Sequence, residues 1–390
     1  MNKGNMYWQT YLNLENEFLE LSKYIYITDT ITKIDSRTKV VKNVKCDDQL
    51  ATYSNYIADL LIRCCIEIEA VSKELYFDNG GPKERGGHDV YFDTDCLKLL
   101  NEKWNIANKV VLIVASNFNL QKDENRILAP LRKADECSKN IWSKAYQAVK
   151  HDRYNSLYLG NIRALLNAMA ALYLLNIYYR DVKLSTKYAD IYKLDMSFGS
   201  KIFSLKTPNQ NAMVNIINGI GCDDVLQSGD SPYIAKYTDS YYNQVLSARQ
   251  KYLDDLNNYL KNQPELKEVE FIMQFKKAIE IENKDPAQRA ILLWELCKYR
   301  INKKIPANLS FEQRKSALIQ SEEWNCKSRK RSKHVSESEL TPENIQGEID
   351  SAGVQFALEI DDSLRSQFMH KAFTEGCCEI VLDKGNVKYL

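Results

Sequence analysis

Residues 159–179 are apolar almost all the way round a helix, and this stretch limits the folds that are open to the chain. A helix of this kind must be covered on every side, either by other parts of the protein or by lipid. The run contains Asn167 and Asn176, and its uncharged part, between Arg163 and Arg180, is shorter than the ~20 residues that span a bilayer. We therefore predict a buried helix of a helical bundle, not a membrane span.

Further stretches have the same helical periodicity. Apolar residues recur at three- and four-residue steps over residues 7–26, 50–75 and 127–151, which is the spacing of one buried helical face. Residues 95–107 predict a short helix, whereas residues 26–48 are polar and β-branched and predict a loop with a short strand. Glycine and proline number only 14 and 8, so the sequence favours long helices over a turn-rich β fold.

A dense polar cluster follows the stretch 127–151. A helix that ends near His151 carries Lys150 and His151 in its last turn, and Asp152 and Arg153 follow. Cations are favoured at helix C-termini, so a solvated helix end and a functional His–Arg cluster are both open interpretations.

Glu67 lies at the edge of the apolar stripe of residues 50–75, about 60° from its centre on a helical wheel. A carboxylate in that position needs a cationic partner. Arg63, one turn earlier, offers a weak intrahelical ion pair. Lys150 or Arg153 on a packed neighbouring helix would offer a stronger, partly desolvated one, so we predict that Glu67 meets the His151 cluster.

The two stretches together resemble a known family. The resemblance is carried by Tyr53-Ser54, LLIRCCIEIE at residues 60–69 and Lys73, then by Trp142, AYQ at 145–147, VKHDR at 149–153 and the apolar helix that follows. This pattern is similar to the HEPN superfamily over residues 1–205. Members of that superfamily are small helical bundles, often dimeric, of prokaryotic defence and toxin systems, and many are ribonucleases that use no metal.

The resemblance implies two functions of different kinds. In a toxin-like defence ribonuclease, His151 would accept the 2′-hydroxyl proton, Arg153 or Lys150 would stabilise the phosphorane charge, and Glu67 would orient the His or the Lys. In the alternative, the bundle is a non-catalytic module that binds RNA or a protein partner of the same defence system. No Arg precedes His151 within residues 146–150, although the superfamily's ribonucleases carry one there, and this difference favours the alternative. The resemblance also implies a homodimer formed through the bundle.

The composition changes after about residue 205. Residues 206–238 concentrate Gly, Asp, Asn, Ser and Pro and predict an irregular linker between a first domain at 1–205 and a second at 239–390. Helical patterns at 242–260 and 266–281, and one opened by Asp285-Pro286, make the second domain mostly helical. Ser310 with Gln313 predicts a capping box, Thr341-Pro342 another helix start, and residues 379–390 a terminal β-hairpin. The expected fold is thus mainly α.

The strongest electrostatic feature of the chain lies in the second domain. Five cations stand within seven residues, with a tryptophan just before them: Trp324, Lys327, Arg329, Lys330, Arg331 and Lys333. Such a cluster is either a solvated loop or a patch that contacts nucleic-acid phosphates, with Trp324 stacked on a base.

Net charge and cysteine content limit the kinds of binding site and the cellular location that we expect. A formal net charge of +1 excludes a surface that is cationic throughout, so any nucleic-acid binding must come from a local patch. The 10 cysteines form no CxxC pair and only 4 histidines are present, so we expect no metal site and no cofactor. The first residues contain no apolar signal segment, and we expect a cytoplasmic protein with reduced thiols and no membrane partner.

Overall fold

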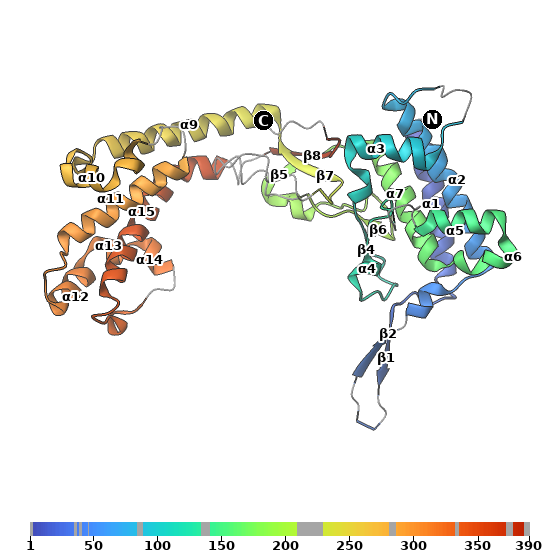
Figure 1. Cartoon of the computed structure of the whole chain (residues 1–390), viewed down its shortest axis with the longest axis horizontal. Coiled ribbons are helices and arrows are strands. Elements are labelled where there is room, and N and C mark those ends of the chain that lie inside the picture. The colour runs from blue at the N-terminus through green and yellow to red at the C-terminus, as the bar shows by residue number, and fades with distance from the viewer. Residues whose placement is uncertain are drawn as a thin grey trace.

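The computed structural model describes residues 3–34, 37–38, 41–45, 47–83, 89–133, 141–208, 229–280, 286–331, 335–371 and 377–385. It is mainly helical, as the sequence predicted, and its elements form two bodies (Figure 1). A single long helix, α9 (Asp239–Lys261), runs from the first body to the second.

The first body is built around α7 (Ile162–Arg180). Nearly every side chain from Ile162 to Tyr178 is buried, and even Asn176 is fully enclosed, with its Nδ2 donating to Leu172 O at 3.0 Å. By length and composition α7 could cross a membrane, but 83% of its most apolar window is buried inside the protein. The prediction of a buried bundle helix is confirmed.

Helices that precede α7 in the sequence surround it in the first body. They are α1 (Lys3–Leu21), α2 (Asn55–Asp78), α3 (Leu97–Trp104), α5 (Ile141–His151) and the short α6 (Arg153–Ser156). Ser54 caps α2 by accepting a hydrogen bond from Ile57 N at 3.2 Å. The helix therefore begins at Asn55, five residues after Leu50, where the apolar stripe predicted its start. Leu50 belongs to a preceding 3-10 helix, η1 (Asp47–Ala51).

Shorter helical turns complete this body. They are a π-helical turn at Phe92–Cys96, 3-10 turns at Ile106–Asn108, Leu157–Leu159 and Tyr188–Lys193, and α4 (Asp123–Arg126).

The long helix predicted over residues 127–151 is wrong in its first half. Ile127–Leu128 forms strand β4, which pairs with β3 (Val111–Ile113), and β3 pairs in turn with β6 (Phe203–Ser204). Pro130 explains the difference, because proline removes a backbone donor and disfavours a helical residue before it. The Pro130 carbonyl instead accepts a hydrogen bond from Trp142 Nε1 at 2.8 Å. Ala134, which the pattern included, lies outside the described residues.

Residues 26–48, predicted as a loop with a short strand, contain two strands. β1 (Thr30–Ile34) and β2 (Val41–Lys45) pair antiparallel, with Thr30 opposite Lys45. This pair projects from the end of the first body (Figure 1).

The second body consists of helices after α9. They are a 3-10 turn at Pro264–Lys267, α10 (Val269–Glu280), α11 (Pro286–Lys304), α12 (Phe311–Gln320), α13 (Glu322–Asn325), α14 (Lys327–Arg331), a 3-10 turn at Glu337–Glu339, and α15 (Ile345–Met369). The capping box of Ser310 and Gln313 is confirmed. α15 follows Thr341 but begins at Ile345. A Cβ on Gly353 would lie 2.9 Å from Lys298 Cα, so glycine permits α15 to pack closely on α11.

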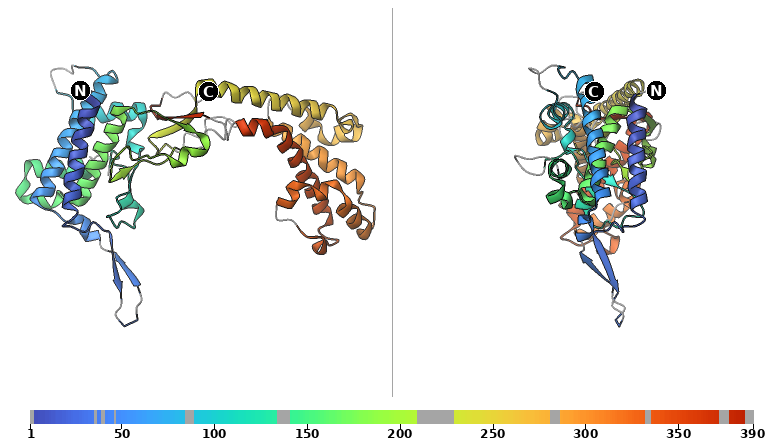
Figure 2. Two further views of the ribbon diagram at one scale, coloured as in Figure 1. Left: turned by 180° about the vertical axis from the view of Figure 1, so that it is seen from behind. Right: turned by 90° about the vertical axis from the view of Figure 1, so that its right-hand side faces the viewer.

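The C-terminal strand returns to the first body. β8 (Cys377–Leu382) lies between β5 (Leu184–Lys187) and β7 (Tyr233–Tyr237), antiparallel to both. A strand was predicted here, but as part of a terminal hairpin; its partners come instead from earlier in the chain, and residues 386–390 lie outside the described residues. The second body is therefore connected to one sheet at both ends, through β7 and β8 (Figure 2).

A buried ion pair fixes the end of β8. Lys109, whose side chain is 0% exposed, contacts Asp383 Oδ2 at 2.7 Å and donates to Ser231 O at 3.0 Å. This contact joins three parts of the chain that are far apart in sequence.

Candidate functional site

The His151 cluster lies at the C-terminal end of α5 and is open to solvent. Lys150, His151 and Arg153 are all exposed, and the Lys150 ammonium lies 5.3 Å from the centre of the Tyr146 ring. Asp152 ends the helix and caps α6 by accepting from Asn155 N at 3.2 Å. The geometry matches the interpretation as a solvated helix end.

Glu67 does not meet this cluster, contrary to our prediction. Arg153 Nη2 contacts Asp59 Oδ1 at 2.7 Å, because α6 packs beside the start of α2, two turns before Glu67. Arg63 pairs with Glu17 of α1, with both nitrogen–oxygen distances 2.6 Å. In the described part of the chain no hydrogen bond or ion pair reaches the half-buried Glu67 carboxylate, and burial raises its pKa. Three of the four residues proposed as catalytic, Lys150, His151 and Arg153, thus lie in one cluster, and Glu67 forms no hydrogen bond or ion pair with them.

The basic cluster of the second domain is also different from the patch that we predicted. Trp324 is only 7% exposed, and the Arg329 guanidinium stacks on it, with Cζ 3.3 Å from the ring centre. Arg329, 5% exposed, pairs with Glu348 Oε2 at 2.9 Å. Trp324 and Arg329 therefore hold α13, α14 and α15 together, and neither is available to nucleic acid. Lys327, Lys330 and Arg331 are exposed, and Lys333 lies outside the described residues.

Four exposed tyrosines adjoin the His151 cluster, and the sequence analysis, which named Tyr53 only for the family resemblance, did not identify them as a surface. They are Tyr53, Tyr56, Tyr154 and Tyr158, with 52%, 47%, 95% and 56% of their surface exposed. They belong to two segments in contact, because Tyr53 pairs with Asn161 through the backbone and Ile162 N donates to Thr52 O at 3.0 Å. We call these four residues the tyrosine surface. Tyr154 and Tyr158 lie between the charged residues 150–153 and the apolar run of residues 159–179, and this position was the available signal, whereas Tyr53 fitted the apolar stripe of residues 50–75.

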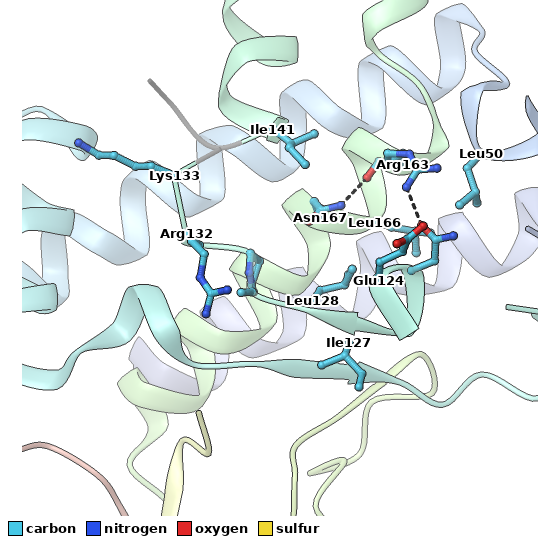
Figure 3. A pocket seen from close by; sticks show the side chains of 13 residues that line it. Leu50, Glu124, Ile127, Leu128, Arg132, Lys133, Ile141, Arg163, Leu166 and Asn167 are labelled. Atoms are coloured by element: carbon cyan, nitrogen blue, oxygen red, sulfur yellow. Dashed lines mark hydrogen bonds between the residues drawn. The ribbon is translucent and has the colours of Figure 1, made fainter. Parts of the chain in front are cut away.

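A second feature is a cavity of about 360 Å³ beside the first turns of α7. Its walls come from η1, the β4 segment, the start of α5 and the first turns of α7, and Arg132, Lys133 and Arg163 contribute its cations (Figure 3). The pattern of residues 127–151 did not reveal it, because a continuous helix there would leave no such space.

Metal ligands are not grouped in the described ranges: no three His, Cys, Asp or Glu side chains there could hold one ion. Cys64 and Cys65 are buried on α2, and burial raises the pKa of both thiols, that of Cys64 to about 12. These thiols pack as apolar side chains.

The fold and these surfaces define a mainly helical protein of two bodies joined through one sheet and one long helix. No protein-family model, curated protein or solved structure matches the chain.

Proposed function

We propose that the protein is a non-catalytic binding module that works through protein contacts, and that its first partner is a second copy of itself. The tyrosine surface is the observation that carries this proposal. Tyrosine and arginine are enriched in protein interfaces, because they bury a large area with little loss of conformational entropy. Large side chains that are grouped on the surface and about half or more exposed to water indicate a surface that a partner covers.

The charges around the tyrosine surface favour a protein over nucleic acid. Three cations, Lys150, Arg153 and Arg63, stand beside three acids, Asp59, Asp152 and Glu17, and two of these pairs are already formed. Nucleic-acid affinity depends on cations that are free to contact phosphates. A surface of balanced charge is suited to a copy of itself, because the same patch must be complementary to itself across a two-fold axis.

The ribonuclease remains the alternative proposal, in the prokaryotic defence setting that the HEPN-like pattern implies. His151 is exposed and could reach an RNA strand, but Arg153 is paired with Asp59 and Glu67 lies elsewhere on α2. A base without an orienting partner and a cation that is already paired make a poor catalytic set. The binding module fits this geometry better.

We expect the double variant Tyr154→Ala, Tyr158→Ala to dissociate a dimer. A buried interface tyrosine contributes about 2 kcal/mol or more, so its loss raises the dissociation constant at least about tenfold. Sedimentation velocity across micromolar concentrations measures this constant. Tyr192→Ala is the matched control, because Tyr192 is 67% exposed but lies on the 3-10 turn at Tyr188–Lys193, and it should leave the dimer unchanged. A wild-type protein that stays monomeric throughout this range contradicts the proposal.

Incubation with total RNA separates the two functions. The binding module predicts that wild-type protein and His151→Ala leave the RNA intact alike. Cleavage by the wild type that disappears in His151→Ala would establish the ribonuclease instead, and cleavage that survives in the variant would exclude His151 as the base.

A further inference from the structure

Helix α14 is attached to the second body by its inward side and lies beside α15 (Figure 1). Arg329 is its buried residue: the guanidinium lies on the Trp324 ring, with Cζ 3.3 Å from the ring centre, and pairs with Glu348 Oε2 at 2.9 Å. At the start of α14, Lys327 N donates to Glu359 Oε2 at 2.7 Å. Because Glu348 and Glu359 both belong to α15, these contacts fix α14 against that helix at two points.

The other cations of α14 face outward together. An α-helix turns by about 100° per residue, so Lys330, Lys327 and Arg331 lie within about 100° of one another, and Arg329 lies on the opposite side. All three outward cations are exposed. In the part of the chain that the structure describes, none of the three side chains takes part in an ion pair, whereas that of Arg329 does. We call these three residues the α14 face.

The α14 face destabilises its own helix. Lys327 stands three residues before Lys330 and four before Arg331, and like charges at these spacings repel each other on a helix surface. The packing of the second body uses Arg329 but none of the three outward cations. An anionic partner would remove the repulsion. Because the formal net charge of the chain is only +1, attraction of such a partner must come from a local group of cations.

A chain of phosphates suits the α14 face better than a single phosphate does. The three side chains leave a convex surface in different directions, and Lys327 and Arg331 start about 6 Å apart along the helix axis. One small anion therefore cannot contact all of them. A nucleic-acid strand carries a phosphate about every 3.4 Å along its axis, so neighbouring phosphates of one strand can each contact a different cation.

A lipid membrane is a less suitable polyanion for this face. Peripheral helices that bind membranes combine cations with apolar side chains that enter the lipid. The sequence of α14, KSRKR, contains no apolar residue, and Trp324, directly before it, is only 7% exposed beneath Arg329. The same burial prevents Trp324 from stacking on a base, so the α14 face offers contacts to phosphates alone.

We propose that the α14 face binds the phosphate backbone of nucleic acid without reading the base sequence. Contacts to phosphates position a protein on a strand but carry no direct sequence information. The α14 face belongs to the second body, outside residues 1–205, which carry the family resemblance. It goes beyond the proposed self-association and does not depend on it, because the tyrosine surface lies on the first body.

Fluorescence anisotropy of the full chain with a labelled oligouridine and with a labelled DNA duplex, over a range of salt concentrations, tests the proposal. Each phosphate contact contributes about 0.7 to the slope of log K against log salt for a single strand, and about 0.9 for a duplex. The double variant Lys330→Ala, Arg331→Ala should therefore reduce the slope by about 1.4 with oligouridine and about 1.8 with the duplex. Because both side chains are exposed, the melting temperature should not change.

The matched control removes the same charge elsewhere on the second body. Lys261 ends α9 and Lys267 lies in the 3-10 turn that follows, and both are exposed. Lys261→Ala, Lys267→Ala should keep the wild-type slope. Equal reductions in the two double variants, or an unchanged slope in the α14 variant, would refute the site. Binding of the wild type to phosphatidylserine vesicles but to neither nucleic acid would overturn the proposal in favour of a membrane partner.

Discussion

Asp383→Asn is expected to lower the free energy of unfolding by about 3–5 kcal/mol, because it leaves the ammonium of Lys109 buried without an anion. Lys109 is 0% exposed, and its remaining partner is the carbonyl of Ser231. Lys109→Met removes the same ion pair but should cost less. The apolar methionine side chain fills the space of the lysine, and the Asp383 side chain, 18% exposed, keeps some contact with water.

Urea denaturation measures the free energy of unfolding of both variants, and the double variant provides a further test. Lys109→Met combined with Asp383→Asn should be more stable than Asp383→Asn alone, since the uncompensated charge has then been removed. Lys384→Met is the matched control, because Lys384 pairs with Asp181 at 2.9 Å with both side chains partly exposed, and it should cost less than about 1 kcal/mol. Equal losses from Lys109→Met and Asp383→Asn would contradict the explanation.

Glu15→Gln is expected to lower the free energy of unfolding by about 2–4 kcal/mol, which is the second large effect. The Glu15 carboxylate is 1% exposed and only accepts hydrogen bonds, from Tyr11 OH at 2.7 Å, from Ser200 Oγ, and from the backbone nitrogens of Lys201 and Ile202 at 3.1 Å. A glutamine amide would turn an NH₂ group towards some of these donors and leave them unpaired in the core.

Glu17→Gln provides the control on the same helix. Glu17 forms its ion pair with Arg63 at the surface, where both side chains are at least one-third exposed, so the same chemical change should cost less than about 1 kcal/mol. Chemical denaturation of both variants gives the comparison. If the two losses are similar, the network around Glu15 does not stabilise the core in the way that we describe.

The helices were predictable where a periodic apolar stripe meets a single core, as in α2 and α7. The pattern of residues 127–134 was apolar for a different reason, since β4 buries Leu128 against β3, and Pro130 was the signal against a helix. Apolar spacing alone does not distinguish a short buried strand from a helix turn.

Side-chain partners were less predictable than helices. Arg153 contacts Asp59 and not Glu67, which lies two turns further along the same helix. Which of the two carboxylates Arg153 meets depends on the position along α2 at which α6 packs, and the pattern of residue types does not determine that position. In the same way, the packing of α15 decides that Arg329 turns inward to Glu348 and Trp324, although a run of cations suggests an exposed loop.

The position of β8 has a consequence for synthesis of the chain. β5 and β7 are made long before β8, and until residue 382 leaves the ribosome each has an edge without its partner strand. Sheets that pair strands distant in sequence close slowly, and open edges can pair with other chains. A nascent chain must therefore complete the whole second body before the first can finish its sheet. Truncation after α15 should yield an aggregating protein, although every helix of the bundle is present.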